Sequence, residues 1–158
     1  MSPDMDLLVR LVMATFIGGL IGLNRDLHGK PAGVRTHALV ALGSALILVV
    51  SGYLPGVDGA HVADVQSRVI QGVITGVGFL GAGVILHSVN DKRVHGLTTA
   101  AAVWVAALFG AGCGTGAFKP VLVAFVLLII VLTLGGKFEK AIHRRLHPRD
   151  DRTAPPDA

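Results

Sequence analysis

Five long apolar stretches follow one another along the chain, separated by short polar segments. They are Leu7–Leu23, His37–Leu54, Val69–Leu86, Leu97–Ala111 and Val121–Leu134. A helix needs about 20 residues to cross the roughly 30 Å hydrocarbon core of a bilayer, within a range of about 17–25. With their flanks, the stretches predict spans at 7–23, 37–54, 69–86, 97–113 and 119–135. Barrel strands alternate over about ten residues, so the pattern predicts an all-α bundle of five transmembrane helices.

Lysine and arginine lie almost entirely in alternate gaps between these stretches. The gaps after the first and third stretches and the C-terminal segment hold 11 of them, and the remaining gaps hold two. Arg10 lies inside the first stretch. Positive residues that flank membrane spans stay in the cytoplasm, so we predict an external N-terminus and a cytoplasmic C-terminus. This arrangement requires an odd number of spans, and five is odd.

Composition supports a membrane protein and excludes several other classes. Charged residues make up 15% of the chain, against about 25% in soluble domains. The alternating gaps already account for the net charge of +4, so nucleic-acid binding is not predicted. A single cysteine, Cys113, excludes an intrachain disulfide and a metal site built from cysteines. A cleavable signal peptide is not expected, since the first six residues are acidic rather than basic.

The chain is predicted to form one membrane domain, 1–137, followed by a basic cytoplasmic tail, 138–158. Phe138, Ile142 and Leu146 recur every fourth residue at the start of this tail, which indicates a short amphipathic helix. The polar, proline-rich sequence that follows is typical of disorder.

Small residues recur at helical spacing within two of the stretches. Ala14, Gly18 and Gly22 share one face of the first, and several glycines lie close together in the third. Small residues let helices approach closely in lipid, although glycine is also generally frequent in membrane helices. We predict a tight bundle centred on the first and third spans, with these packing positions: Gly18, Gly22, Gly72, Gly76, Gly78, Gly81, Gly83 and Trp104.

The glycines from Gly76 to Gly81 also match the G-x-G-x-x-G pattern of dinucleotide-binding sites. That motif requires a preceding strand and an acidic residue about 20 positions further on. Here it lies inside an apolar stretch, and Asp91 follows only ten residues after Gly81. No nucleotide or other cofactor is therefore predicted.

Polar residues concentrate in the two gaps predicted to be cytoplasmic. The first gap mixes both charge signs in a segment bent by glycine and proline, which favours an organised polar network over simple anchoring of helix ends in the headgroups. We expect Asp26 to pair with Arg35, and Arg10, near the outer end, to contribute little. No histidine pair has a recognised ligand spacing, so no metal site is predicted. The candidate functional residues are Arg25, Asp26, Lys30, Arg35, Thr36, His37, Arg93, Thr98 and Thr99.

Three ordered segments carry a resemblance to a known family. Gly29–Gly43, Gly78–Ile85 and Val94–Val105 resemble the signature segments of the MgtC/SapB family of bacterial inner-membrane proteins, and the resemblance covers Leu7 to Leu134. The chain departs from the family at Asn24, where an acidic residue is common. It also lacks the C-terminal soluble domain of the longer members, and so resembles a short branch.

The resemblance implies a multi-pass protein of the bacterial inner membrane, linked to magnesium limitation and virulence. A longer member of the family is thought to restrain the F-type ATP synthase rather than to move magnesium, and the resemblance does not by itself extend this role to the short branch. The leading hypothesis is therefore a non-enzymatic regulator that contacts a partner membrane protein within the bilayer, with the F-type ATP synthase as candidate. Association with a second copy of the chain stays open.

The alternative hypothesis is a small cation or proton transporter. Ion pathways usually show ionisable residues deep in the spans, whereas here only Arg10 lies inside one. This disfavours transport, although a channel lined by Thr15, Ser44, Thr75 and backbone carbonyls remains an alternative. Enzymatic activity is not expected, because no nucleophile has a base nearby in the sequence.

Overall fold

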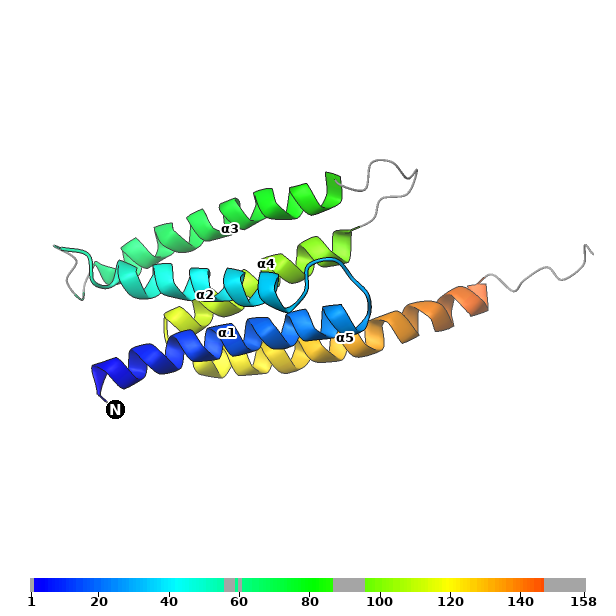
Figure 1. The fold of residues 1–158 in the computed structure, drawn as a ribbon, viewed down its shortest axis with the longest axis horizontal. Helices are drawn as coiled ribbons and strands as arrows, with labels where there is room; N and C mark the ends of the chain where they lie inside the picture. Colours follow the sequence, from blue (N-terminus) through cyan, green and yellow to red (C-terminus); the bar gives the residue numbers. More distant parts are fainter. Residues whose placement is uncertain (1, 56–58, 60, 87–95, 147–158) are drawn as a thin grey trace, which may run out of the picture. The chain divides into compact units, whose positions relative to one another are not determined.

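The computed structural model describes residues 2–55, 59, 61–86 and 96–146, with side chains up to residue 136. This part of the chain contains five helices and no strand, namely α1 (Pro3–Leu27), α2 (Val34–Ser51), α3 (Val62–Leu86), α4 (Leu97–Gly114) and α5 (Phe118–Leu146). All five are long and apolar enough to cross a membrane (Figure 1). The predicted all-α architecture with five spans is therefore confirmed.

Local sequence signals explain where α1 starts. The Ser2 hydroxyl accepts a hydrogen bond from the backbone N–H of Met5 at 3.3 Å, and Pro3 occupies the first helical position. Proline fits there because its missing N–H would have no partner inside the helix. Asp4 and Asp6 lie in the first turn, where negative charge is favourable.

Positive backbone torsions mark both ends of α4. Gly96 precedes the helix with φ of +87°, and Gly116 follows it with φ of +79°. Glycine adopts this left-handed conformation without the steric cost that other residues incur. The turn at Gly116 lets α5 begin at Phe118.

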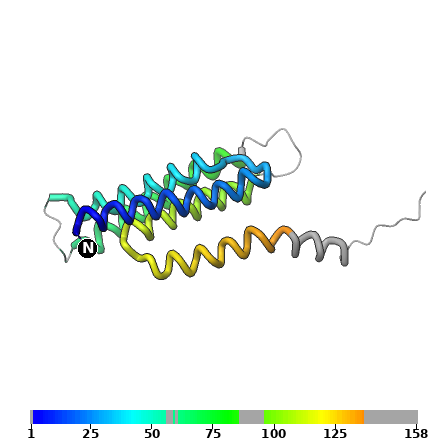
Figure 2. The backbone as a smooth tube through the Cα atoms, turned by 60° about the horizontal axis from the view of Figure 1, so that its bottom comes forward, coloured from blue at the N-terminus to red at the C-terminus, as the bar shows by residue number. Residues whose placement is uncertain are grey.

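The chain divides into two compact units, Met1–Leu122 and Val123–Ala158. In the first unit, α2 packs against both α1 and α4, α1 packs against α4, and α3 packs mainly against α4. Both views show α1 to α4 running alongside one another (Figures 1 and 2). The second unit consists of α5 beyond Leu122, which continues as one helix through Leu146. The helix predicted for the start of the tail is thus continuous with the fifth span.

Glycine makes the closest helix crossings, and they centre on α2. A β-carbon at Gly18 of α1 would lie 2.5 Å from the carbonyl oxygen of His37, and one at Gly22 would lie 2.5 Å from the α-carbon of Val34. On the other side of α2, Gly110 contacts the carbonyl oxygen of Ala41 and Gly114 that of Ala45. The predicted packing roles of Gly18 and Gly22 agree with these contacts.

The prediction that the third span shares the centre of the bundle is wrong. Within the described part of the first unit, nothing lies within 4 Å of a β-carbon built at Gly72, Gly76, Gly78 or Gly83. In α3, Gly81 reaches the β-carbon of Ala100 only at ordinary contact distance, 3.4 Å. Spacing alone did not reveal which glycine face meets a neighbouring helix.

Trp104 also lies outside the core that the sequence analysis assigned to it. Its side chain is 38% exposed on α4. The α3–α4 contact is instead formed by smaller side chains, Val77, Val103 and Ala107. An exposed tryptophan on a membrane helix suits the lipid or the interface better than a helix crossing built from alanine and valine.

Candidate functional site

A buried polar cluster lies where α1 ends and where α2 and α4 begin. Arg25, in the last turn of α1, is only 4% exposed, and its Nη2 donates a hydrogen bond to Oγ1 of Thr99 on α4. Thr99 is itself buried. The Nε of Arg25 has no hydrogen-bond partner among the described residues. A charged group is costly in the bilayer unless it is paired, so this guanidinium depends strongly on Thr99.

His37 of α2 is the second buried member of this cluster. It is fully buried, and its Nδ1 donates to the carbonyl oxygen of Gly33 at 2.9 Å, one turn earlier in the chain. Its Nε2 has no partner in the part of the chain that the structure describes. The ring lies within electrostatic range of both Arg25 and Asp26. The sequence placed His37 on the rim, whereas the fold buries it against α1.

Asp26 caps α2 from the preceding helix. Its Oδ2 accepts a hydrogen bond from the backbone N–H of Val34 at 3.0 Å. Gly33, at the N-cap position, has no side chain for this purpose, and the carboxylate fills the space where its β-carbon would stand. The first N–H groups of a helix have no partner inside it, so Asp26 satisfies one of them and links α1 to α2.

Replacing Asp26 by alanine should therefore lower the free energy of unfolding by about 1 kcal/mol, the usual contribution of a cap. Asp26→Asn should lower the free energy of unfolding by less, because an amide oxygen can still accept the hydrogen bond from Val34. The change is measurable as a lower thermal unfolding midpoint of the purified protein in detergent.

Asp4→Ala is the matched control, because Asp4 is an exposed carboxylate in the first turn of α1 with no side-chain bond among the described residues. Both aspartates experience the helix dipole. Equal effects of Asp26→Ala and Asp4→Ala would show that the capping hydrogen bond contributes nothing.

The ion pair expected between Asp26 and Arg35 is not formed. Asp26 bonds to the α2 backbone, and Arg35 is exposed without an ion-pair partner among the described residues. Lys30, Thr36 and Thr98 are exposed as well, and Arg93 lies outside the described residues. The eight described candidates therefore separate into a buried set (Arg25, His37 and Thr99) and an exposed set (Asp26, Lys30, Arg35, Thr36 and Thr98).

The burial of Arg25 was predictable from its position in the helix. Ala14, Gly18, Gly22 and Arg25 follow one another at intervals of four, four and three residues, which places them on one face. Ala14 is buried, and Gly18 and Gly22 lie at the crossing with α2, so the arginine on the same face must also lie against the bundle.

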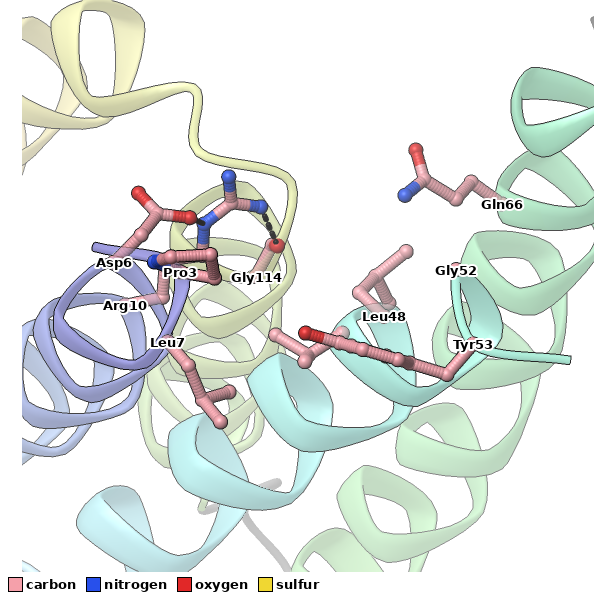
Figure 3. A pocket seen from close by; sticks show the side chains of 10 residues that line it. Pro3, Asp6, Leu7, Arg10, Leu48, Gly52, Tyr53, Gln66 and Gly114 are labelled. Carbon is pink, nitrogen blue, oxygen red and sulfur yellow. Dashed lines mark hydrogen bonds and ion pairs between the residues drawn. The ribbon is translucent and has the colours of Figure 1, made fainter. Parts of the chain in front are cut away.

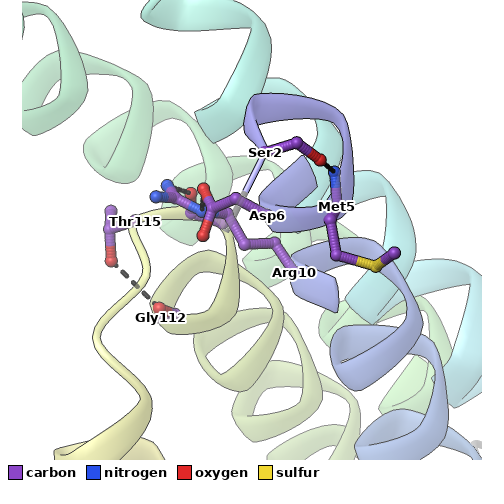
Figure 4. A network of polar contacts seen from close by, with 7 residues as sticks. Ser2, Met5, Asp6, Arg10, Gly112 and Thr115 are labelled. Atoms are coloured by element: carbon purple, nitrogen blue, oxygen red, sulfur yellow. Dashed lines mark hydrogen bonds and ion pairs between the residues drawn. The ribbon is translucent and has the colours of Figure 1, made fainter. Parts of the chain in front are cut away.

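At the opposite end of the bundle, Arg10 connects α1 to the end of α4. Its Nε lies 2.7 Å from Oδ2 of Asp6, one turn earlier (Figure 4). Its Nη1 donates to the carbonyl oxygen of Gly114 at 2.9 Å. A β-carbon at Gly116 would lie 3.1 Å from its Nη2. Arg10 therefore links two helices, and its partner Asp6 was not among the candidate residues; the small functional effect expected of Arg10→Ala stays a prediction.

The described residues contain no group of three or more histidine, cysteine, aspartate or glutamate side chains that could hold a metal ion. The buried cluster presents mainly hydrogen-bond donors, which suit anions and carbonyl oxygens rather than cations. The arrangement is that of a structural polar network joining three helices.

Comparison with known proteins gives a consistent result. The sequence profile of the MgtC family matches residues 11–141. The chain is 39% identical to protein SrpB of Synechococcus elongatus over 94% of its own length and 88% of SrpB. It is 41% identical to the putative magnesium transporter YhiD of Escherichia coli K12, over 80% of this chain and 59% of YhiD.

The chain is also 37% identical to protein SapB of Bacillus subtilis over 92% of its length. It spans 61% of SapB and 59% of YhiD, so in length it is similar to SrpB. No solved structure matches the chain.

Proposed function

The chain belongs to the MgtC family of multi-pass membrane proteins, and on this basis we propose that it is a non-enzymatic regulator of the bacterial inner membrane. It acts through contact with a partner membrane protein rather than by moving an ion. The membrane part of the F-type ATP synthase, implied by the family resemblance, is the first partner to test. The name of its relative YhiD, a putative magnesium transporter, supports a connection with magnesium and is the reason to test the transporter alternative.

The observation that carries this proposal is the sign of the charge buried where α1 ends and α4 begins. Arg25 is the buried ionised side chain of the described residues, and none of their aspartates or glutamates is buried. Magnesium binds through carboxylates, carbonyls and water, and a buried guanidinium repels it. The close glycine crossings of α1 and α4 with α2 also fill the space in which a pathway would run.

Two of the three hydroxyls suggested for a channel, those of Thr15 and Thr75, are already engaged. Thr15 donates to the carbonyl oxygen of Leu11 at 2.8 Å, and Thr75 donates to that of Gln71 at 2.9 Å. A threonine that bonds to its own helix satisfies the hydroxyl proton locally. These contacts weaken the transporter alternative.

The exposed set at the α1–α2 end supplies a surface for a partner. Lys30 and Arg35 are exposed there, next to the exposed apolar side chains of Leu27 and Leu39, which are 76% and 67% accessible. Charged groups beside apolar ones give both orientation and contact area to an interface at the membrane surface.

The double variant Lys30→Ala/Arg35→Ala should abolish complementation of growth at low magnesium while the protein still accumulates in the membrane. These side chains form no ion pair among the described residues, so their loss should not affect folding. Arg68→Ala is the matched control, because Arg68 is exposed in the second turn of α3 and lies on the opposite side in the predicted topology. Full growth with the double variant would show that this surface is not the contact.

A photocrosslinking amino acid at position 35, followed by mass spectrometry of products from native membranes, identifies the partner. Magnesium uptake by proteoliposomes of the purified protein, followed with an internal dye, tests the transporter alternative. Uptake above empty vesicles would overturn the regulator proposal.

A further inference from the structure

A small polar pocket opens at the end of the bundle where α1 begins and where α2 and α4 end. Its volume is about 170 Å³, and four helices of the first unit contribute to it. The side chains that give it its chemistry are Asp6, Arg10, Tyr53 and Gln66 (Figure 3). This site is separate from the buried cluster at Arg25 and from the proposed contact surface.

The groups that face this pocket have unused hydrogen-bonding capacity. Oδ2 of Asp6 forms the ion pair with Nε of Arg10, which makes no hydrogen bond among the described residues, and Nη1 of Arg10 donates to Gly114. The Oδ1 of Asp6 and the Nη2 of Arg10 therefore stay available, and the second lies uppermost on the guanidinium in Figure 3. The Tyr53 hydroxyl and the Gln66 amide form no hydrogen bond within the described part of the chain.

The paired charges select the class of ligand. Asp6 and Arg10 neutralise each other, so the pocket has no net charge to attract a simple anion or cation. Each side chain still has one unused hydrogen-bonding atom. Asp6 offers a carboxylate oxygen, which can only accept, and Arg10 offers a guanidinium nitrogen, which can only donate. A ligand that carries an ammonium next to an anionic group satisfies both at once.

The position of the pocket at the ends of the helices indicates where such a ligand comes from. Asp6 lies in the first turns of α1, Gly52 is the C-cap of α2, and Gly114 is the last residue of α4. Ends of membrane-spanning helices lie at the level of the lipid headgroups. Tyr53, which is 71% exposed beside Gly52, suits this level because its ring and hydroxyl prefer the interface.

We propose that this pocket binds the phosphoethanolamine group of a zwitterionic phospholipid. The phosphate accepts from Arg10 and Tyr53, the ammonium donates to Asp6, and Gln66 bonds to either part. The pocket is far smaller than the roughly 300–1,000 Å³ of sites for drug-sized ligands, so it suits a headgroup and not a nucleotide. In the predicted topology the lipid belongs to the outer leaflet.

The full-length protein, purified in detergent with equal amounts of phosphatidylethanolamine and phosphatidylglycerol, should retain the first over the second by about tenfold in native mass spectrometry. That factor corresponds to one charge-assisted hydrogen bond between the ammonium and Asp6. Asp6→Asn should remove the preference. Tyr53→Phe and Gln66→Leu leave the Asp6–Arg10 pair intact and should each reduce retention about threefold to tenfold.

Lys119→Gln is the matched control, because Lys119 is an exposed cation just after the α4–α5 turn and does not line the pocket. It should leave the preference unchanged. Equal retention of both lipids, or retention of phosphatidylethanolamine that neither Tyr53→Phe nor Gln66→Leu reduces, would overturn the proposal even if Asp6→Asn proves unstable.

The same headgroup could belong to a membrane lipid or to a free soluble compound. Titrating soluble glycerophosphoethanolamine into delipidated protein, followed by phosphorus NMR, distinguishes these two ligands. Binding with the same dependence on Tyr53 and Gln66 would show that the headgroup alone is sufficient and that a free ligand can occupy the site. Retention of the lipid without binding of the soluble compound would show that the acyl chains are required. If neither binds, the pocket holds only water and the proposal is wrong.

Discussion

Replacing Gly110 by alanine should destabilise the protein by about 3 kcal/mol or more, at the upper end of the usual cost of overpacking a core. The added methyl group would overlap the carbonyl oxygen of Ala41. That oxygen belongs to the backbone of α2, so no side-chain rotation can relieve the clash. The two helices would have to separate, and the neighbouring contact of Gly114 with Ala45 would open with them.

Gly18→Ala should have a similar effect at the crossing of α1 with α2, where the new β-carbon would meet the His37 carbonyl oxygen at 2.5 Å and the Ala41 β-carbon at 2.8 Å. Gly19 offers a control in the same helix, since nothing lies within 4 Å of its built β-carbon in the described structure. Gly19→Ala should be neutral or stabilising by up to about 1 kcal/mol, because alanine favours helix over glycine.

The measurement can use the protein's own cysteine. Cys113 is the sole cysteine of the sequence and is fully buried, so a fluorogenic thiol dye reports unfolding. A loss of about 3 kcal/mol corresponds to a midpoint lower by roughly 6–12 °C for a chain of this size. Equal midpoints for the Gly18→Ala and Gly19→Ala proteins would show that the α1–α2 crossing is looser than described.

Thr99→Val should destabilise the protein by about 3 kcal/mol, although the two side chains have nearly the same shape. The hydroxyl accepts the hydrogen bond of the buried Arg25 guanidinium, whose Nε already lacks a partner. A buried donor left unsatisfied costs about 1–3 kcal/mol, and more when it is charged. Valine would thus leave two positions of one buried cation without an acceptor.

Removing the Arg25 charge together with the Thr99 hydroxyl should restore most of the stability that Thr99→Val loses. Replacing both members of a buried polar pair by apolar groups of similar shape is often nearly neutral. The double variant Arg25→Met/Thr99→Val should therefore unfold within about 1 kcal/mol of the original protein. The same dye assay measures both proteins.

Thr98→Val provides the control for Thr99, since Thr98 is the adjacent residue and is exposed. It should change the midpoint little. If the double variant were as unstable as Thr99→Val alone, the pairing of Arg25 with Thr99 would not explain the effect, and Arg25 would have to interact elsewhere.

The number and nature of the helices followed from the sequence alone. A continuous apolar run can only be satisfied in lipid as a helix, since each N–H must then bond within its own segment. This local requirement does not depend on neighbours, and the predicted spans agree with α1 to α5 except at their ends. Residues that favour the start of a helix, such as the N-cap Ser2 and Pro3 at the first position of α1, extend these ends beyond the apolar runs.

The tertiary structure decided which face of each helix packs against a neighbouring helix. Glycine is compatible with close packing at Gly18 and at Gly76 alike, but only Gly18 meets another backbone, because α2 and not α3 lies beside α1. The partners of charged side chains also depend on how the helices are placed. Asp26 and Arg35 are suitable partners in sequence, yet Asp26 bonds to the unpaired N–H of Val34 when α2 begins next to it.

Arg10 and Arg25 show most clearly which contacts the sequence cannot predict. Both lie on α1 and both look like isolated cations in the sequence, but their partners, Gly114 and Thr99, are 104 and 74 residues further along the chain. Hydropathy and spacing describe one helix at a time, whereas such bonds depend on how α4 is placed against α1. The sequence therefore determined the helices and their local signals, and the packing of α1, α2 and α4 determined which polar groups became buried partners.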